Sequence, residues 1–206
     1  MIFSALISAV IQTLLLTLIP FLVYVIGHKT AKGFWRWLGV HKFPQKALVY
    51  ALIIAGASLI LISLPQYWMF RQGYLYNNLN ASLPAQALAQ TGWGIQTMVV
   101  TLIWACIQTS FSEEIFFRGF VAKRLIGKIG FLGGNLLNAV LFGGIHLFGV
   151  IAYGFLPSAI IFLFTASIGF ALGYLMEKKA EGSILPGWIL HAAVNVLSTV
   201  IVSFYI

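Results

Sequence analysis

The sequence predicts an all-α membrane protein: one transmembrane domain (residues 1–206), built as a bundle of about six transmembrane helices with an amphipathic segment at the membrane interface. Hydrophobic residues make up 61% of the 206 residues and charged residues only 8%, whereas a soluble domain carries roughly a quarter charged residues. A helical span needs about 20 apolar residues, so the chain has room for roughly six spans and short loops. No separate soluble domain is therefore expected.

Six apolar runs define the expected spans. They cover residues 2–26, 47–64, 94–117, 131–150, 157–176 and 184 to the C-terminus. The first run is long and no basic segment precedes it, so we expect a membrane span and not a cleaved signal. The second run stops at Pro65, and residues 66–91, rich in Asn, Gln and Tyr, are expected to form the largest loop. The segment Phe34-Trp35-Arg36-Trp37-Leu38 mixes tryptophans with a basic side chain, which is typical of the headgroup zone.

The net charge of +8 comes mainly from two connections, residues 27–46 and 118–130. With six alternating spans, both connections fall on one side of the membrane. The positive-inside rule places them in the cytoplasm and both termini on the opposite side. Because the basic residues lie between apolar runs, we expect the lipid bilayer and not nucleic acid as a partner. A chain this compact is expected in a bacterial cell membrane.

Only four residues are acidic, and none of them is aspartate. Glu177 and Glu181 lie in a short turn beside lysines, where solvated charge explains them. Glu113 and Glu114 lie inside the third apolar run, where a charge costs about 2.5–3.5 kcal/mol on insertion scales. An acid kept at that cost is a candidate functional residue.

Helical spacing separates the roles of Glu113 and Glu114. Glu114 and Arg118 are at positions i and i+4, so they are expected to form an ion pair that supports the helix end. Glu113 points about 100° away, and its own i+4 neighbour, Phe117, offers no partner. A second carboxylate nearby and a medium of low dielectric both favour the neutral form of Glu113, as a general acid or base requires. Glu113 is the better catalytic candidate.

Two histidines also lie in apolar runs. His146 shares a helix face with Asn138 and Phe142, and His191 lies one turn before Asn195. One such histidine more often makes a hydrogen bond between helices, but three helices that each carry polar residues indicate convergence inside the bundle. Gly169 and Gly173 form a small-xxx-small pair that indicates helix packing.

At this point the residues resemble a known family. The motifs Glu113-Glu114-x-x-x-Arg118, Phe142-x-x-x-His146 and His191-x-x-x-Asn195 are similar, in order and spacing, to those of the CPBP family. That family comprises type II CAAX prenyl endopeptidases and bacteriocin-processing or immunity proteins, also called Abi proteins. Arg118-Gly119-Phe120 and Gly187-Trp188 are similar too. The resemblance covers about residues 108–197, the expected catalytic core.

The resemblance implies an intramembrane glutamic endopeptidase. Glu113 with His146 would activate a water for attack on a peptide carbonyl, and His191 with Asn195 would stabilise the oxyanion. Glu114, with Arg118 as structural support, would complete the site. Peptide hydrolysis needs such a base, a proton for the leaving amine and donors for the oxyanion. No serine or cysteine is grouped with these residues, so an acyl-enzyme is not expected.

No metal or other cofactor is implied, although one glutamate and two histidines could also form a three-ligand zinc site. The expected substrate is a peptide or a membrane-anchored protein cleaved near the cytoplasmic face, in peptide processing, bacteriocin processing or self-immunity. Two alternatives stay open. The chain could be a non-catalytic immunity or scaffold protein, or a small transporter that uses the same Glu and His cluster.

One expectation conflicts with the others. If the fourth span begins near Phe131, His146 lies about 22 Å along it, whereas Glu113 and His191 would lie one or two turns from the cytoplasmic face. The depths agree only if the fourth helix starts in the cytoplasm, tilts strongly, or breaks at Gly143-Gly144.

Overall fold

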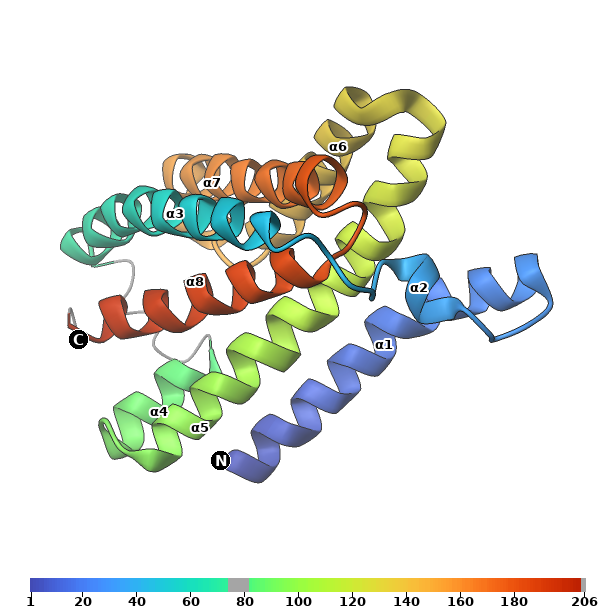
Figure 1. The fold of residues 1–206 in the computed structure, drawn as a ribbon. Helices are drawn as coiled ribbons and strands as arrows, with labels where there is room; N and C mark the ends of the chain where they lie inside the picture. The colour runs from blue at the N-terminus through green and yellow to red at the C-terminus, as the bar shows by residue number, and fades with distance from the viewer. Residues whose placement is uncertain (74–81, 205–206) are drawn as a thin grey trace.

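The computed structural model describes residues 1–73 and 82–204, and all regular structure in these residues is helical (Figure 1). Four helices are long and apolar enough to cross a membrane, and a fifth apolar helix is shorter. The four are Ile2–His28, Lys46–Met69, Ile95–Leu147 and Phe155–Lys179, and the shorter one is Leu185–Ile201. The predicted all-α membrane bundle is confirmed.

The helical stretch Ile95–Leu147 reverses direction within its length. It consists of α5 (Ile95–Leu102), two π-helical segments, η2 (Ile103–Phe111) and η3 (Glu114–Ala122), and α6 (Lys123–Leu147). Inside α6 the backbone leaves helical geometry at Ile129 and Gly130, where Gly130 has a φ of 79°. Glycine adopts this left-handed region readily, so the chain folds back as a hairpin beside the α6 label in Figure 1. With the two arms counted separately, the described residues contain six apolar helices.

The predicted end of the third span is wrong. Residues 118–130 were expected to form a basic connection, but the helix continues through them to the turn at Ile129. Two of the basic side chains belong to the packed bundle. Arg118 is fully buried, and the Arg124 guanidinium donates to the Gly119 carbonyl over 2.7 Å. Their charges therefore do not mark a loop.

The predicted loop 66–91 is also wrong in part. Helix α3 (Lys46–Arg71) continues past Pro65, as membrane helices tolerate when neighbouring groups satisfy the freed carbonyl. Helix α4 (Leu83–Thr91) begins after Ser82, whose hydroxyl accepts a hydrogen bond from the Ala85 amide over 3.3 Å. Residues 74–81 of the expected loop lie outside the described residues.

The predicted amphipathic segment forms the short helix α2 (Phe34–Leu38). Gly33 and Gly39 flank it, each with positive φ. Phe34 and Leu38 are buried, whereas Trp35 is half exposed. Helix α2 therefore packs one apolar face on the bundle and leaves tryptophan surface outside.

Helices α6 and α7 (Phe155–Tyr174) pack through the predicted glycine pair. A Cβ on Gly169 would lie 3.1 Å from the Phe142 ring, and one on Gly173 would overlap the Asn135 side chain. The remaining apolar helix, α8 (Leu185–Ser203), follows the π-helical turn η5 (Leu175–Lys179) and a short loop. Gly169 and Gly173 thus let α7 approach the helix that carries His146.

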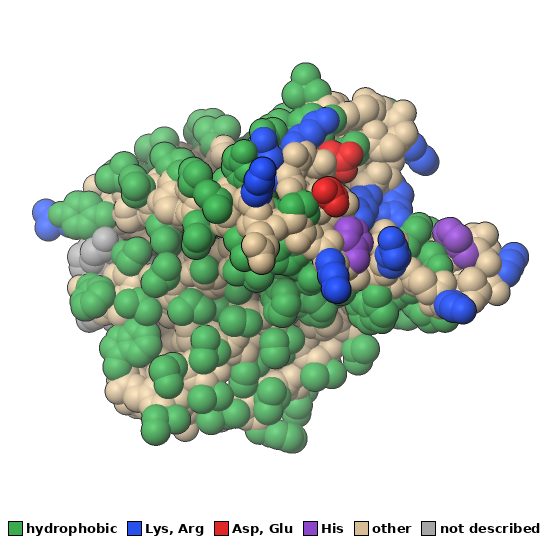
Figure 2. All heavy atoms as spheres, viewed as in Figure 1, with side chains coloured by type: hydrophobic (Ala, Val, Ile, Leu, Met, Phe, Trp, Pro, Cys, Tyr) green, Lys and Arg blue, Asp and Glu red, His purple; other side chains and the backbone are tan. Residues whose placement is uncertain are grey.

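Charged side chains gather at one end of the molecule. Figure 2 shows most of them around α2, the neighbouring ends of α1 (Ile2–His28) and α6, and the turn after α7, with one basic side chain at the far left, while hydrophobic side chains cover most of the rest of the visible face. A charged end beside a broad apolar surface is the distribution expected of a protein embedded in a bilayer.

Candidate active site

The helix that carries the glutamate pair is wider than an α-helix on both sides of it. Segments η2 and η3 flank Ser112 and Glu113, and π-helical turns are rare and occur often at functional sites. Side chains satisfy three carbonyls of the first segment. The Thr109 hydroxyl donates to Trp104 O (3.0 Å), Trp188 Nε1 to Cys106 O (2.6 Å) and Gln12 Nε2 to Gln108 O (2.8 Å).

Glu114 is completely buried and joins two side chains. Its Oε1 lies 3.2 Å from Nη1 of Arg118 and 3.3 Å from Nδ1 of His191. The ion pair predicted from the i, i+4 spacing is therefore present, and Arg118 also lies over the Phe142 ring at 4.1 Å. Gly187 makes room for the carboxylate, since a Cβ there would lie 2.9 Å from Glu114 Oε2. The contact with His191 was not predicted.

Glu113 approaches the other nitrogen of the same imidazole. Its Oε2 lies 3.9 Å from His191 Nε2. The two glutamates were expected to point about 100° apart, as in an α-helix. Both carboxylates nevertheless reach one ring, each at a different nitrogen. His191 thus lies between Glu113 and Glu114.

Four of the five predicted catalytic residues line one cavity of about 270 Å³. They are Glu113 from between the two π-helical segments, His146 from α6, and His191 and Asn195 from α8. Glu114 lies behind His191 and does not line the cavity. The structure therefore brings the polar residues of three helices together inside the apolar bundle.

The two histidines are held by their Nδ1 atoms. His146 Nδ1 lies 2.7 Å from the carbonyl oxygen of Phe142, which can only accept a hydrogen bond, so Nδ1 carries the proton. His191 Nδ1 likewise donates to the Glu114 carboxylate. In the neutral form of each ring, Nε2 is then the nitrogen with the free lone pair.

Asn195 makes a contact that its motif did not indicate. Its Nδ2 donates to Thr109 Oγ1 over 2.9 Å and to Ser110 Oγ over 3.2 Å. Both amide hydrogens are therefore engaged with η2. Thr109 and Ser110 were not among the predicted site residues, although two hydroxyls just before a buried glutamate pair are a signal that could have singled them out.

The conflict over depth disappears because the third helix is longer than predicted. Glu113 lies sixteen residues before Ile129, and His146 lies sixteen residues after Gly130. Both are therefore about 24 Å from the hairpin turn and level with each other. The helix does not break at Gly143-Gly144. The hairpin therefore brings the two residues level without a break in the helix.

Glu113 also lies far from the basic end of α1. Glu113 shares a pocket with Leu15 of α1, thirteen residues before His28 at the basic end of that helix. Thirteen residues correspond to about 20 Å along the helix axis. Glu113 therefore lies deep in the bundle.

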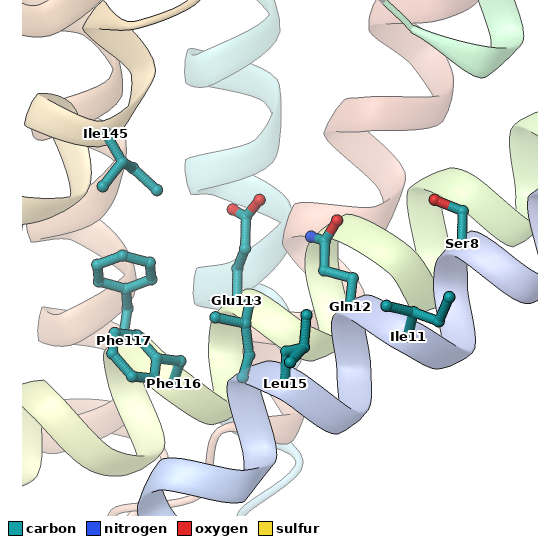
Figure 3. A pocket seen from close by; sticks show the side chains of 9 residues that line it. Ser8, Ile11, Gln12, Leu15, Glu113, Phe116, Phe117 and Ile145 are labelled. Atoms are coloured by element: carbon teal, nitrogen blue, oxygen red, sulfur yellow. The ribbon is translucent and has the colours of Figure 1, made fainter.

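A second space reaches Glu113 from outside (Figure 3). This groove has a volume of about 500 Å³ and is lined on one side by α1, including Ser8, Ile11 and Gln12, and on the other by Phe117 and Ile145. Glu113 lines both the groove and the inner cavity. Glu113 is therefore a residue that the two spaces share.

No group of three or more His, Cys, Asp or Glu side chains in residues 1–73 and 82–204 is arranged to hold a metal ion. The cluster offers two carboxylates beside one imidazole, together with a histidine across the cavity. What these groups supply directly is proton transfer and hydrogen bonding.

Residues 94–197 match the family described as Type II CAAX prenyl endopeptidase Rce1-like. No curated protein and no solved structure matches the chain. The matched segment is half of the 206 residues and contains Glu113, Glu114, His146, His191 and Asn195. With its apolar helices, the chain is an integral membrane protein, and it belongs to the Rce1-like family of type II CAAX prenyl endopeptidases, a family of proteases.

Proposed function

We propose that the chain is an intramembrane endopeptidase that hydrolyses peptide bonds with a water activated by Glu113. The observation that carries this proposal is the convergence of Glu113, His146, His191 and Asn195 on one cavity. Polar and ionisable residues are costly inside a bilayer and mark functional sites. Membership of a protease family indicates which chemistry the cluster performs.

Glu113 acts as the general base. It takes one proton from the water as the water oxygen attacks the carbonyl carbon of the scissile bond, and the free Nε2 of His146 accepts a hydrogen bond from the second proton. Glu113 then gives its proton to the amine nitrogen as the carbon–nitrogen bond breaks. The products are a carboxylic acid and an amine, and the carboxylate of Glu113 is regenerated.

His191 stabilises the oxyanion of the tetrahedral intermediate. In its imidazolium form the ring donates from both nitrogens, from Nδ1 to Glu114 and from Nε2 toward the cavity. Arg118 holds Glu114 in place through the buried ion pair. Asn195 holds α8 against η2 through Thr109 and Ser110, which keeps His191 beside the glutamates.

The substrate is a peptide or a membrane-anchored protein that reaches Glu113 through the groove between α1 and α6. This groove opens on the hydrophobic exterior, where Ile11 and Leu15 are more than half exposed. With the basic loops in the cytoplasm of a bacterial cell membrane, as the positive-inside rule predicts, peptide or bacteriocin processing and self-immunity are the proposed roles.

The test is cleavage of a peptide library by the purified protein in detergent, with Glu113→Gln as the test variant and Glu181→Gln as its matched control. Glu181 is an exposed carboxylate in the loop before α8. We expect Glu113→Gln to lose at least about 10²-fold in rate while it unfolds at the wild-type temperature, and Glu181→Gln to retain full activity. Full activity of Glu113→Gln would refute the proposal.

Other outcomes identify the alternatives. Activity that a chelator removes and zinc restores would identify a metal enzyme. Ion flux into liposomes that needs Glu113 and occurs without proteolysis would identify a transporter. A stably folded protein with neither activity would be a scaffold or immunity protein.

A further inference from the structure

The N-terminal helix lies outside the family-matched segment and yet contributes a polar residue next to Glu113. Gln12 of α1 lines the same groove as Glu113, and Figure 3 shows the Gln12 carboxamide and the Glu113 carboxyl group side by side, pointing the same way. We propose that Gln12 is a positioning residue for Glu113, so that α1 is part of the catalytic unit. This inference rests on the proposed function.

Gln12 is bonded to the helical turn that leads into Glu113. Its Nε2 donates to the Gln108 carbonyl over 2.8 Å and to Ser112 Oγ over 3.3 Å. Its Oε1 accepts from Gln108 Nε2 over 3.3 Å. Ser112 immediately precedes Glu113 and donates its own hydroxyl to the Gln108 carbonyl. One carboxamide therefore connects α1 to this turn by three hydrogen bonds.

These bonds matter because the turn is not an ordinary α-helix. The Gln108 carbonyl belongs to η2, close to its junction with Ser112 and Glu113. Trp188 of α8 binds the Cys106 carbonyl of the same segment. Gln12 and Trp188, from two different helices, thus hold the wide helix in the form that directs Glu113 to His191.

The position of Gln12 in the bilayer supports a specific role. It lies near the middle of α1, whose other inner polar groups are small hydroxyls such as Ser8 one turn earlier. A carboxamide at this depth is unfavourable without hydrogen-bond partners. Gln12 is half-buried, with its polar atoms directed to η2 and the groove.

The test compares Gln12→Leu with Gln66→Leu. Gln66 is a matched control because its Nε2 also makes a hydrogen bond between two spans, to Ser198 Oγ over 2.7 Å, and this bond joins α3 to α8 and not to the helix of Glu113. We expect Gln12→Leu to lower kcat about tenfold, with KM within about twofold of wild type, since a small misplacement of a catalytic group slows the chemical step. Gln66→Leu should keep the wild-type kcat, and its Tm should fall by about as much as that of Gln12→Leu.

A double-mutant cycle that combines Gln12→Leu with Glu113→Asp distinguishes a positioning role of Gln12 from a general loss of structure. The aspartate side chain is one methylene shorter than that of glutamate, so the carboxylate at position 113 is already misplaced in this background. In this background we expect Gln12→Leu to lower kcat by less than about threefold, because two changes that act through one group are not additive. Equal losses in both backgrounds, or a wild-type kcat for Gln12→Leu, would overturn the inference.

A second measurement does not depend on activity. The rate at which a hydrophobic carbodiimide labels Glu113, followed by mass spectrometry, reports the surroundings of the carboxyl group. We expect a change of about threefold or more in Gln12→Leu, the scale of a modest change in local environment, and none in Gln66→Leu. If the wild type cleaves no peptide, the proposed function fails, while this comparison still decides whether Gln12 positions Glu113. Equal labelling rates would reject that role.

Discussion

His191 Nδ1 lies 3.3 Å from Glu114 Oε1, and the same oxygen lies 3.2 Å from Arg118 Nη1. Glu114 is therefore more than a support for the helix end. It fixes which nitrogen of His191 carries the proton and directs the other nitrogen toward Glu113. Arg118 provides the positive charge that pairs with this buried carboxylate.

Removing the charge of Glu114 is expected to lower the stability of the folded protein. Glu114→Gln leaves the buried Arg118 without a counter-charge, and breaking a buried pair in this way costs about 3–5 kcal/mol. Thermal unfolding in detergent measures the loss. The double variant Glu114→Gln, Arg118→Met removes both charges and should regain most of the stability without regaining activity. A wild-type Tm for Glu114→Gln would show that the ion pair is not needed for stability.

Replacing His191 is expected to affect catalysis more than folding. His191→Gln keeps a polar side chain of similar size but cannot carry the imidazolium charge, so kcat should fall by about 10²–10⁴-fold. His41→Gln is the matched control, because the His41 ring lies outside the site and bonds the carbonyl of its neighbour Lys42. Peptide cleavage assays measure kcat for both variants. A loss in His41→Gln as large as that in His191→Gln would point to a general effect of histidine replacement.

Thr109 distinguishes two roles for Asn195. If Asn195 acts by anchoring α8 to Thr109, then Thr109→Val and Asn195→Ala should lower kcat by similar factors, and the double variant should lose little more. If Asn195 donates directly to the oxyanion, Asn195→Ala alone should cost about 10²–10³-fold. The structure favours the first result, because both amide hydrogens already bind hydroxyls. Full activity of Thr109→Val beside an inactive Asn195→Ala would establish the second.

Two adjacent glycines of α6 should respond in opposite ways. A Cβ on Gly143 would lie 2.9 Å from the Phe162 carbonyl and 2.9 Å from Ala166 Cβ, whereas one on Gly144 would meet nothing within 4 Å. Gly143→Ala should destabilise the protein by about 1–3 kcal/mol, and Gly144→Ala should stabilise it by up to about 1 kcal/mol. Thermal unfolding of the two variants measures the difference. Equal effects would mean that α6 and α7 do not pack as described.

Several span boundaries could not be predicted because charge alone does not mark a loop. Arg118 and Arg124 follow an apolar run, and the usual inference is that the membrane ends there. Each finds a partner inside the fold, Arg118 with Glu114 and Arg124 with the Gly119 carbonyl. Such partners come from the packed structure, so a count of charges misplaces the turn by about ten residues, from Arg118 to Ile129.

The sequence by itself determined the membrane class, the approximate number of apolar helices and four of the polar residues that line the cavity. These follow from composition and from the cost of polar side chains in lipid, both of which are local properties. The tertiary structure alone decided that Glu113 and Glu114 share His191, that Asn195 binds Thr109, and that Gln12 of α1 belongs beside the site. Each of these is a contact between side chains or backbone groups of different helices, and the spacing of residues along one ideal helix contains no information about such contacts.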